Sequence, residues 1–275
     1  MNPSFNIRSG IPGTATCDLF IEAGPTGLSI VISDDQHSFR SLVVYSFPPG
    51  ADDASIADHI GRIFQEESLL KQPYKRTVIS WTFHASILVP NEFMNAETTA
   101  GLLELVHGDV VKGQVRSDFM FRQNIHNIYR LPEAVVNKLP QAFQFVMQTH
   151  LYSLVPDMIP KQGDVLWVIF YNQSMIVALT KQDSLQCIQH IEYNDAEDAS
   201  WHLLNVCRSF EVDPGEVMLC LNGQVDENSA LYAALYKYFL RTELAALPAD
   251  AAYNDGIRQY PAHYFSHLFQ QALCV

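Results

Sequence analysis

The feature of this sequence that most constrains its fold is an order of elements that occurs twice. The first copy predicts three strands, a helix and a fourth strand: Asp18–Ala23, Leu28–Ser33, Ser38–Phe47, Ala54–Leu70 and Thr77–Thr82. The four residues Gly24-Pro25-Thr26-Gly27 are typical of a turn, so the first two strands should form a hairpin. Helical spacing of Ile56, Ile60 and Phe64 gives the helix one apolar face. A three-stranded meander followed by a helix and a strand is therefore expected.

The second half repeats this order. Its predicted elements are Val165–Tyr171, Met175–Thr180, Ser184–Tyr193, the helix Asp195–Phe210 and the strand Glu216–Leu221. In each half, the first strand and the strand after the helix lie about 50 to 60 residues apart, which is the scale of one supersecondary unit. We therefore expect an α/β protein with mixed sheets and two related lobes, residues 14–160 and 161–275, divided by a linker at Pro156–Gly163.

Further elements are expected outside the two copies. They are a helix at Ala96–Val106, strands at Val115–Phe121 and Ile125–Tyr129, a helix from Pro132, a strand at Phe145–Leu154, and helices at Ser229–Phe239 and His263–Leu273. The apolar stripe of the helix at Ser229–Phe239 is interpreted as core.

Composition excludes several classes of function. The chain has 275 residues and a net charge of −13, so its field repels nucleic acid and anionic lipid, and no nucleic-acid partner is expected. No window approaches the roughly 20 apolar residues that span a bilayer, and Met1–Gly13 lacks the apolar core of a secretory signal. The five cysteines are odd in number and widely spaced, which favours reduced, buried thiols. We expect a cytoplasmic protein that does not insert into membranes.

The repeated order resembles the ribonuclease-H-like unit that occurs twice in actin-like ATPases. Five segments are similar to an uncharacterised bacterial family, a domain of unknown function assigned to the actin-like fold: FIEAGPTGLSIVISD, RSDFMFRQNIHNIYRLPEAV, EDASWHLLNVCRSFEVDPGEVMLCLNGQ, SALYAALYKYF and YPAHYFSHLFQQALC. This resemblance covers nearly the whole chain. It implies two lobes and an intracellular setting, and it supplies no established substrate, catalytic residue or cofactor.

The resemblance also indicates where nucleotide chemistry should lie. Actin-like ATPases carry an Asp-x-Gly hairpin in each lobe, whose amides hold phosphates while the carboxylates organise Mg²⁺. The matching first-lobe position is Glu22-Ala23-Gly24, followed by Pro25 and Thr26, so a carboxylate and a glycine remain. The second-lobe turn, Phe170-Tyr171-Asn172-Gln173-Ser174, has neither, which predicts that amides cannot approach a phosphate there.

The adenosine-side motif of these proteins is a strand that ends in paired glycines. Here Val217–Leu221 is followed by Asn222-Gly223-Gln224, so one glycine remains, although Asn-Gly is also a common turn sequence. If a nucleotide binds, its contacts should be Glu22, Gly24, Thr26 and Gly223. Glu22 is more simply interpreted as a solvated or capping carboxylate than as a metal organiser.

Other catalytic motifs are absent from the sequence. His263 and His267 have the i, i+4 spacing that suits zinc, but no third ligand is indicated, so surface or packing roles are favoured and no metal is expected. No Gly-x-Ser-x-Gly elbow and no Walker-type loop occurs. No catalytic residue is assigned.

The sequence therefore favours a degenerate actin-like protein, a pseudoenzyme that needs no cofactor and acts in interaction or scaffolding with an unknown protein partner or as a homodimer. The alternative is a divergent nucleotide-binding protein or weak ATPase that uses ATP and Mg²⁺ in a cleft between the lobes. A small-molecule binding module is a third hypothesis. Five aromatic residues near the C-terminus suggest an interface, with core packing as the competing explanation: Tyr253, Tyr260, Tyr264, Phe265 and Phe269.

Overall fold

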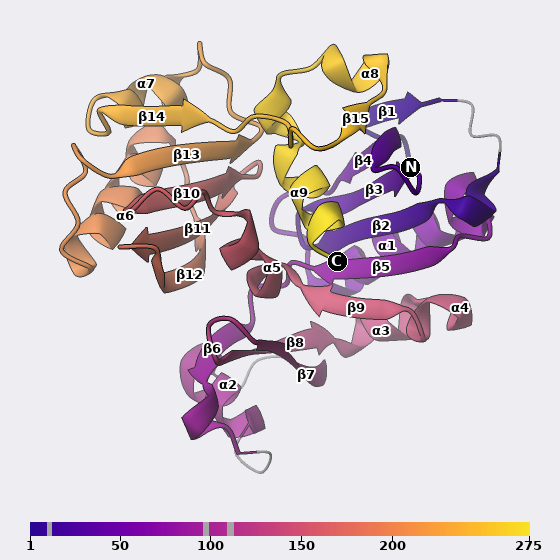
Figure 1. Ribbon diagram of the computed structural model, residues 1–275. Helices are drawn as coiled ribbons and strands as arrows, with labels where there is room; N and C mark the ends of the chain where they lie inside the picture. Colours follow the sequence, from indigo (N-terminus) through magenta and orange to yellow (C-terminus); the bar gives the residue numbers. More distant parts are fainter. Residues whose placement is uncertain (10–12, 96–98, 109–112) are drawn as a thin grey trace. The chain divides into compact units, whose positions relative to one another are not determined.

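The computed structural model describes residues 1–9, 13–95, 99–108 and 113–275, which divide into two compact units (Figure 1). The first unit comprises Met1–Leu154, Asp250–Ile257 and Val275. The second comprises Val155–Ala249 and Arg258–Cys274. A short segment from the sequence range expected for the second lobe thus belongs to the first unit.

The first unit is built on a seven-stranded sheet with the order β1-β4-β3-β2-β5-β9, and β15 pairs with β4 beside this path. The strands are β1 (Phe5–Arg8), β2 (Asp18–Gly24), β3 (Gly27–Ser33), β4 (Ser38–Ser46), β5 (Arg76–Trp81), β9 (Met147–His150) and β15 (Ala252–Tyr253). β2, β3 and β4 form the expected antiparallel meander, and β5 lies parallel to β2.

The helix α1 (Asp53–Glu66) covers one face of this sheet (Figure 1). It begins where the Asp52 side chain accepts a hydrogen bond from the Ser55 amide at 2.9 Å, which satisfies a donor of the first turn. Its buried stripe, which includes Ile60 and Phe64, packs with the inward side chains of the strands. Burial of each such side chain stabilises the fold by about 1.5–3 kcal/mol.

The second unit contains a five-stranded sheet with the order β12-β11-β10-β13-β14. The strands are β10 (Val165–Phe170), β11 (Ser174–Lys181), β12 (Ser184–Glu192), β13 (Met218–Gly223) and β14 (Arg241–Leu244). The helix α6 (Ala196–Ser209) is capped by Asp195, and its Leu203 and Cys207 join the core formed with the sheet. The helix α7 (Ala230–Tyr236) packs against α6.

The duplication predicted from the sequence extends to the pairing of the strands. The orders β4-β3-β2-β5 and β12-β11-β10-β13 correspond one to one, with antiparallel meanders and a parallel fourth strand in both units. Even the register irregularity recurs, between Ile32 and Ser33 in β3 and between Leu179 and Thr180 in β11. The two units are therefore variants of one folding unit.

A smaller, three-stranded sheet lies within the first unit, with the order β6-β8-β7. Its strands are β6 (Ser86–Pro90), β7 (Gly113–Met120) and β8 (Ile125–Pro132). The helix α2 (Thr99–His107) packs on it through Leu103, against Val89 and Ile128. The expected start of this helix at Ala96 falls outside the described residues.

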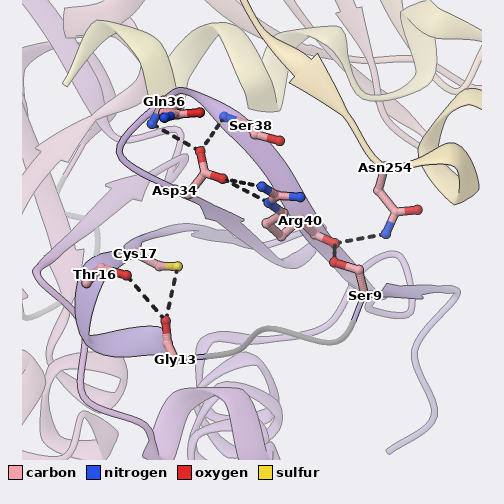
Figure 2. Close-up of polar contacts among 9 residues, drawn as sticks. All are labelled: Ser9, Gly13, Thr16, Cys17, Asp34, Gln36, Ser38, Arg40 and Asn254. Atoms are coloured by element: carbon pink, nitrogen blue, oxygen red, sulfur yellow. Dashed lines mark hydrogen bonds and ion pairs between the residues drawn. The ribbon is translucent and has the colours of Figure 1, made fainter.

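Polar contacts attach the segment Asp250–Ile257 to the first sheet (Figure 2). The Arg40 carbonyl of β4 accepts hydrogen bonds from the Asn254 side chain at 3.0 Å and the Ser9 hydroxyl at 2.9 Å. The Arg40 guanidinium in turn donates to Asp34 at 2.6 and 2.9 Å, and Asp34 also accepts from the amides of Gln36 and Ser38. One residue of β4 thus joins three segments that are distant in sequence.

Several boundaries differ from those expected. Only Met147–His150 of the expected strand at Phe145–Leu154 is extended, because the helix α5 (Leu151–Met158) follows at once and takes in Pro156, the expected start of the linker. The helix expected at Ser229–Phe239 ends at Tyr236. The remaining helices are α3 (Glu133–Lys138), α4 (Gln141–Gln144), α8 (Asp255–Arg258) and α9 (Ser266–Cys274). Each helix in the described ranges is too short or too polar to cross a bilayer.

Candidate functional site

Three of the predicted contact residues, Glu22, Gly24 and Thr26, come together at the β2–β3 hairpin of the first unit. Gly24 pairs with Gly27, so Pro25 and Thr26 form a two-residue turn, and the Thr26 carbonyl accepts the Phe47 amide at 2.9 Å. Gly223, the fourth predicted residue, ends β13 and belongs to the second unit.

Glu22 is buried within a polar row that crosses the sheet. Its backbone pairs with Ser29 on β3 and with Ser80 on β5, and Ser80 pairs with Thr149 on β9. All four residues are buried. The interpretation of Glu22 as a solvated carboxylate at a strand end is therefore wrong, because Glu22 lies inside the sheet and is only 5% exposed.

The polar row ends on Asp118 of β7, a residue that the sequence analysis did not single out. Asp118 Oδ2 accepts hydrogen bonds from the Thr149 hydroxyl at 2.9 Å, the His150 amide at 2.8 Å and the Ser153 hydroxyl at 2.7 Å. The Tyr129 hydroxyl donates to Oδ1 at 3.3 Å. These donors fix the carboxylate and join the small sheet to the large one. A lone carboxylate in a strand was visible in the sequence, but the three donors to its Oδ2 lie more than thirty positions away.

Neighbouring atoms of the first unit leave no room for a side chain at either glycine of the first hairpin, Gly24 or Gly27. A Cβ atom on Gly24 would overlap Thr82 Oγ1 and would lie 3.0 Å from Thr82 Cβ. A Cβ atom on Gly27 would overlap the Tyr45 carbonyl. Close packing therefore explains these glycines without a phosphate, although the turn itself still follows a buried carboxylate as in the family pattern.

Three carbonyls of the second-unit turn, between β10 and β11, accept hydrogen bonds from Tyr193. The Tyr193 hydroxyl donates to the carbonyls of Tyr171 at 3.1 Å and Asn172 at 3.4 Å, and the Tyr193 amide donates to Gln173 at 3.1 Å. The turn contains neither a glycine nor a carboxylate. Its residues do not fit the role of a phosphate-binding hairpin with a metal-organising acid.

Gly223 is not in a free turn, as the Asn-Gly sequence suggested, but at the paired end of β13. Its φ is 84°, and a Cβ atom there would overlap the Phe170 carbonyl, so only glycine fits. The neighbouring Asn222 is fully buried; its amide donates to the Val168 carbonyl at 3.3 Å, and its Oδ1 accepts from Ser266 of α9 at 2.8 Å. The motif thus connects β10, β13 and α9.

The two histidines with zinc-like spacing pack separately, as the sequence favoured. His263 lies in a 3₁₀ turn, and its Nε2 is 2.7 Å from the Val225 carbonyl. His267 lies in α9, and burial lowers the pKa of its imidazole to about 3, so the ring is neutral. No group of three or more metal-ligating side chains occurs in the part of the chain that the structure describes.

Four of the five cysteines are at least partly buried, as expected, but the expectation is wrong for Cys274, which is exposed near the end of α9. Burial raises the pKa of Cys187 to about 11 and those of Cys207 and Cys220 to about 12, so these three thiols stay protonated and unreactive at neutral pH.

The interface expected at the C-terminal aromatic residues is not supported. Tyr253, Phe265 and Phe269 are buried, Tyr264 is half-buried, and Tyr260 is 39% exposed. Apart from Tyr260, most of the large exposed apolar side chains lie elsewhere. In the first unit they include Phe93, Leu105, Val106, Phe119, Phe121, Phe145 and Met147, and in the second Trp201, Tyr236, Tyr238 and Leu240.

A family model described as protein of unknown function, DUF3822, matches residues 11–241. The chain belongs to this family. The resemblance stated from the sequence, to a domain of unknown function with an actin-like fold, is thereby confirmed. No curated protein matches the chain.

Solved structures confirm the actin-like ATPase fold of this DUF3822 member. A Bacteroides thetaiotaomicron protein with that fold and unknown function aligns with a TM-score of 0.76 at 16% identity, over 91% of this chain and 98% of the other. The PilM-PilN type IV pilus biogenesis complex gives 0.60 at 12% identity, over 96% and 99%. Ethanolamine utilization protein EutJ from Carboxydothermus hydrogenoformans gives 0.52 at 8% identity, over 98% and 93%.

Proposed function

We propose that this protein is a non-catalytic member of the actin-like fold that acts in the cytoplasm by binding another protein or a second copy of itself. The observation that carries the proposal is the second-unit turn from Phe170 to Ser174. It lacks the glycine and the carboxylate of the family's phosphate-binding hairpin, and Tyr193 engages three of its carbonyls. Hydrolysis in this fold requires both hairpins, because phosphate and Mg²⁺ must be held together.

The remaining nucleotide-like positions support the same proposal. Gly24 and Gly223 both face atoms of their own unit at the place where a side chain would lie, so each glycine has a packing role. The competing hypothesis, a divergent nucleotide-binding protein or weak ATPase, depends on Glu22, Gly24, Thr26 and Gly223. It requires that these residues keep a second role in addition to the structural one.

An interaction role is supported by apolar surface on the small sheet of the first unit. Phe121 is 83% exposed and Phe119 47% exposed, and their rings meet edge to face with centroids 6.2 Å apart. Grouped exposed aromatic side chains are typical of surfaces that bind proteins. One solved structure with a similar fold is described as the PilM-PilN type IV pilus biogenesis complex, and this description supports an interaction role.

The interaction can be tested by site-specific photo-crosslinking in cells. A photoreactive phenylalanine analogue at Phe121 should give a discrete adduct with another protein or with a second copy of the chain. The same analogue at Gln186, an exposed position on β12, should not. Equal adduct patterns at both positions, or none at either, would contradict a specific binding surface on the small sheet.

The absence of nucleotide chemistry can be tested by thermal unfolding. A ligand at 100 times its dissociation constant stabilises a protein by about 2.7 kcal/mol, which corresponds to a rise in melting temperature of several degrees. We expect no such rise with millimolar Mg-ATP or Mg-ADP. A rise that disappears in Glu22→Gln would support the nucleotide-binding hypothesis instead.

A further inference from the structure

An open groove of about 590 Å³ lies on the surface of the second unit, at the start of α6. Its apolar part is formed by Trp201 and Leu204 of α6 and by Tyr238, just after α7. Its polar lining consists of Asn194, Asp195, Glu197, Asp198 and the buried Ser200. The volume falls in the range of about 300–1,000 Å³ that is usual for binding sites.

Trp201 is the unusual residue of this groove. The other two tryptophans, Trp81 and Trp167, are fully buried, whereas Trp201 is 59% exposed. The opposite face of α6 supplies the helix's core contacts through Leu203 and Cys207, so folding does not require a large aromatic side chain at position 201. Tyr238, 43% exposed, provides a second aromatic wall. Exposed tryptophan and tyrosine side chains at one groove are typical of a binding site.

The charges around the aromatic walls indicate which ligand the groove suits. Asp195 Oδ1 caps the helix by accepting the Asp198 amide at 2.9 Å, and Glu197 Oε1 pairs with Lys237 at 2.9 Å. Their second oxygens, Asp195 Oδ2 and Glu197 Oε2, have no hydrogen-bond donor among the described residues. Helix capping accounts for one oxygen of Asp195, and the helix N-terminus and Lys237 account for Glu197, but none of these accounts for the exposed Trp201.

A cation that stacks on an aromatic ring and donates to carboxylates satisfies both features of the groove. Arginine does this better than lysine, because its planar guanidinium stacks on tryptophan and presents several donors in one plane. The net charge of −13 adds a long-range attraction for a basic partner. A neutral apolar segment would leave the free carboxylate oxygens buried without donors, which costs free energy.

We propose that this groove binds an arginine side chain from an extended segment of a partner protein. The guanidinium stacks on Trp201 and donates to Asp195 and Glu197, and an apolar neighbour of the arginine packs on Leu204 and Tyr238. This inference rests on the proposed interaction role and specifies the chemistry of the partner.

The probe is an acetylated, amidated peptide of sequence Gly-Leu-Arg-Leu-Gly, and the matched control replaces arginine with citrulline, which keeps the shape and removes the charge. Because the other tryptophans are buried, a change in tryptophan fluorescence reports on Trp201. We expect a saturable change with the arginine peptide, and about two- to fivefold weaker binding of the citrulline peptide, the ratio expected for loss of one exposed cation–aromatic contact.

Variants locate the binding and separate it from a loss of folding. Calorimetry should show weaker binding to Trp201→Ala, and to Asp195→Asn, which keeps a capping side chain, or Glu197→Gln. Tyr260→Ala, which removes an exposed aromatic side chain outside the groove, should bind the peptide like the wild type. Equal affinity for both peptides, no binding at millimolar peptide, or a dimer in light scattering that Trp201→Ala dissociates would overturn the proposal.

These outcomes are distinct from failure of the proposed function. A rise in melting temperature with Mg-ATP that disappears in Glu22→Gln would support the nucleotide-binding hypothesis over the proposed function, whether or not the peptide binds. Loss of peptide binding with no effect of nucleotide would refute only the arginine site.

Discussion

The close approach of Thr82 to Gly24 makes a prediction that separates a packing role from a phosphate-binding role. Alanine at position 24 would place its Cβ atom on Thr82 Oγ1 and 3.0 Å from Thr82 Cβ. Thr82 is itself 7% exposed, and its amide is held by the Ala23 carbonyl at 3.0 Å, so the side chain has little room to move. Overpacking of this kind costs about 1–3 kcal/mol, and we expect Gly24→Ala to lower the free energy of unfolding by that amount.

Removal of the Thr82 side chain should rescue the variant. In Thr82→Ala the overlapping oxygen is gone, so the double variant should be destabilised by less than the sum of the single variants, with a coupling of about 1 kcal/mol or more. Urea unfolding of all four proteins, with equal m-values, measures this cycle. Additivity within about 0.5 kcal/mol would show that Thr82 is not the reason for glycine at position 24.

Three further predictions follow from the same contacts. Gly223→Ala should destabilise the protein more than Gly24→Ala, because it combines a φ of 84° with overlap of a backbone carbonyl; equal melting temperatures of the two variants would contradict this. Burial lowers the pKa of His150 to about 4 and that of His267 to about 3, so the unfolded chain takes up protons below an ordinary pKa of about 6.5 while the folded chain does not. The free energy of unfolding should therefore fall between pH 7 and pH 5 by about 2 kcal/mol for each ring. In urea unfolding at the two pH values, His267→Phe should remove the part of this fall that is due to His267; an unchanged pH dependence would refute the lowered pKa of His267. Burial alone would raise the pKa of Glu67, but hydrogen bonds from the Leu69 amide, Tyr45 and Arg8 outweigh burial and hold the pKa below its ordinary value. The ionised Glu67 therefore stabilises the fold above about pH 4.3, and this stabilisation is lost as the pH falls through the folded pKa. Glu67→Gln should cost about 1.5–3 kcal/mol at pH 7, and a cost that does not shrink in acid would contradict this account.

The sequence predicts the duplicated core well because its evidence is local. Short apolar runs separated by turn residues define β2, β3 and β4, and the apolar stripe with Asp52 at its start defines α1. The same local patterns define the second copy. Strand order follows from the meander and the right-handed crossover, which leave few alternatives.

The elements that the sequence did not predict depend on distant contacts. β1 and β15 are short strands, and each pairs with β4 from a distant part of the chain. Residues 151–154 continue an apolar run that suits a strand, yet they form the first turn of α5. The local sequence pattern predicts neither the pairing of β1 and β15 with β4 nor the helix at residues 151–154, because both depend on contacts with segments that the sequence alone does not identify.

Some residues of the candidate site could be predicted from local sequence, and others could not. The hairpin residues Glu22, Gly24 and Thr26 could be found from their order in the chain, and the structure places them together. The burial of Glu22 and the network on Asp118 could not be found, since they arise from four strands and a second sheet. The groove at Trp201 could not be found either, because it forms only where α6 and Tyr238, which are distant in sequence, lie side by side.

The most direct measurement of the central claim is the rate of phosphate release from Mg-ATP by the purified protein and by Glu22→Gln, together with binding of Mg-ATP by calorimetry. The account predicts no saturable heat at millimolar nucleotide, and equal background rates for the two proteins. A saturable binding heat and a phosphate release rate that both disappear in Glu22→Gln would contradict it, and would show that the actin-like fold of this family keeps its nucleotide chemistry.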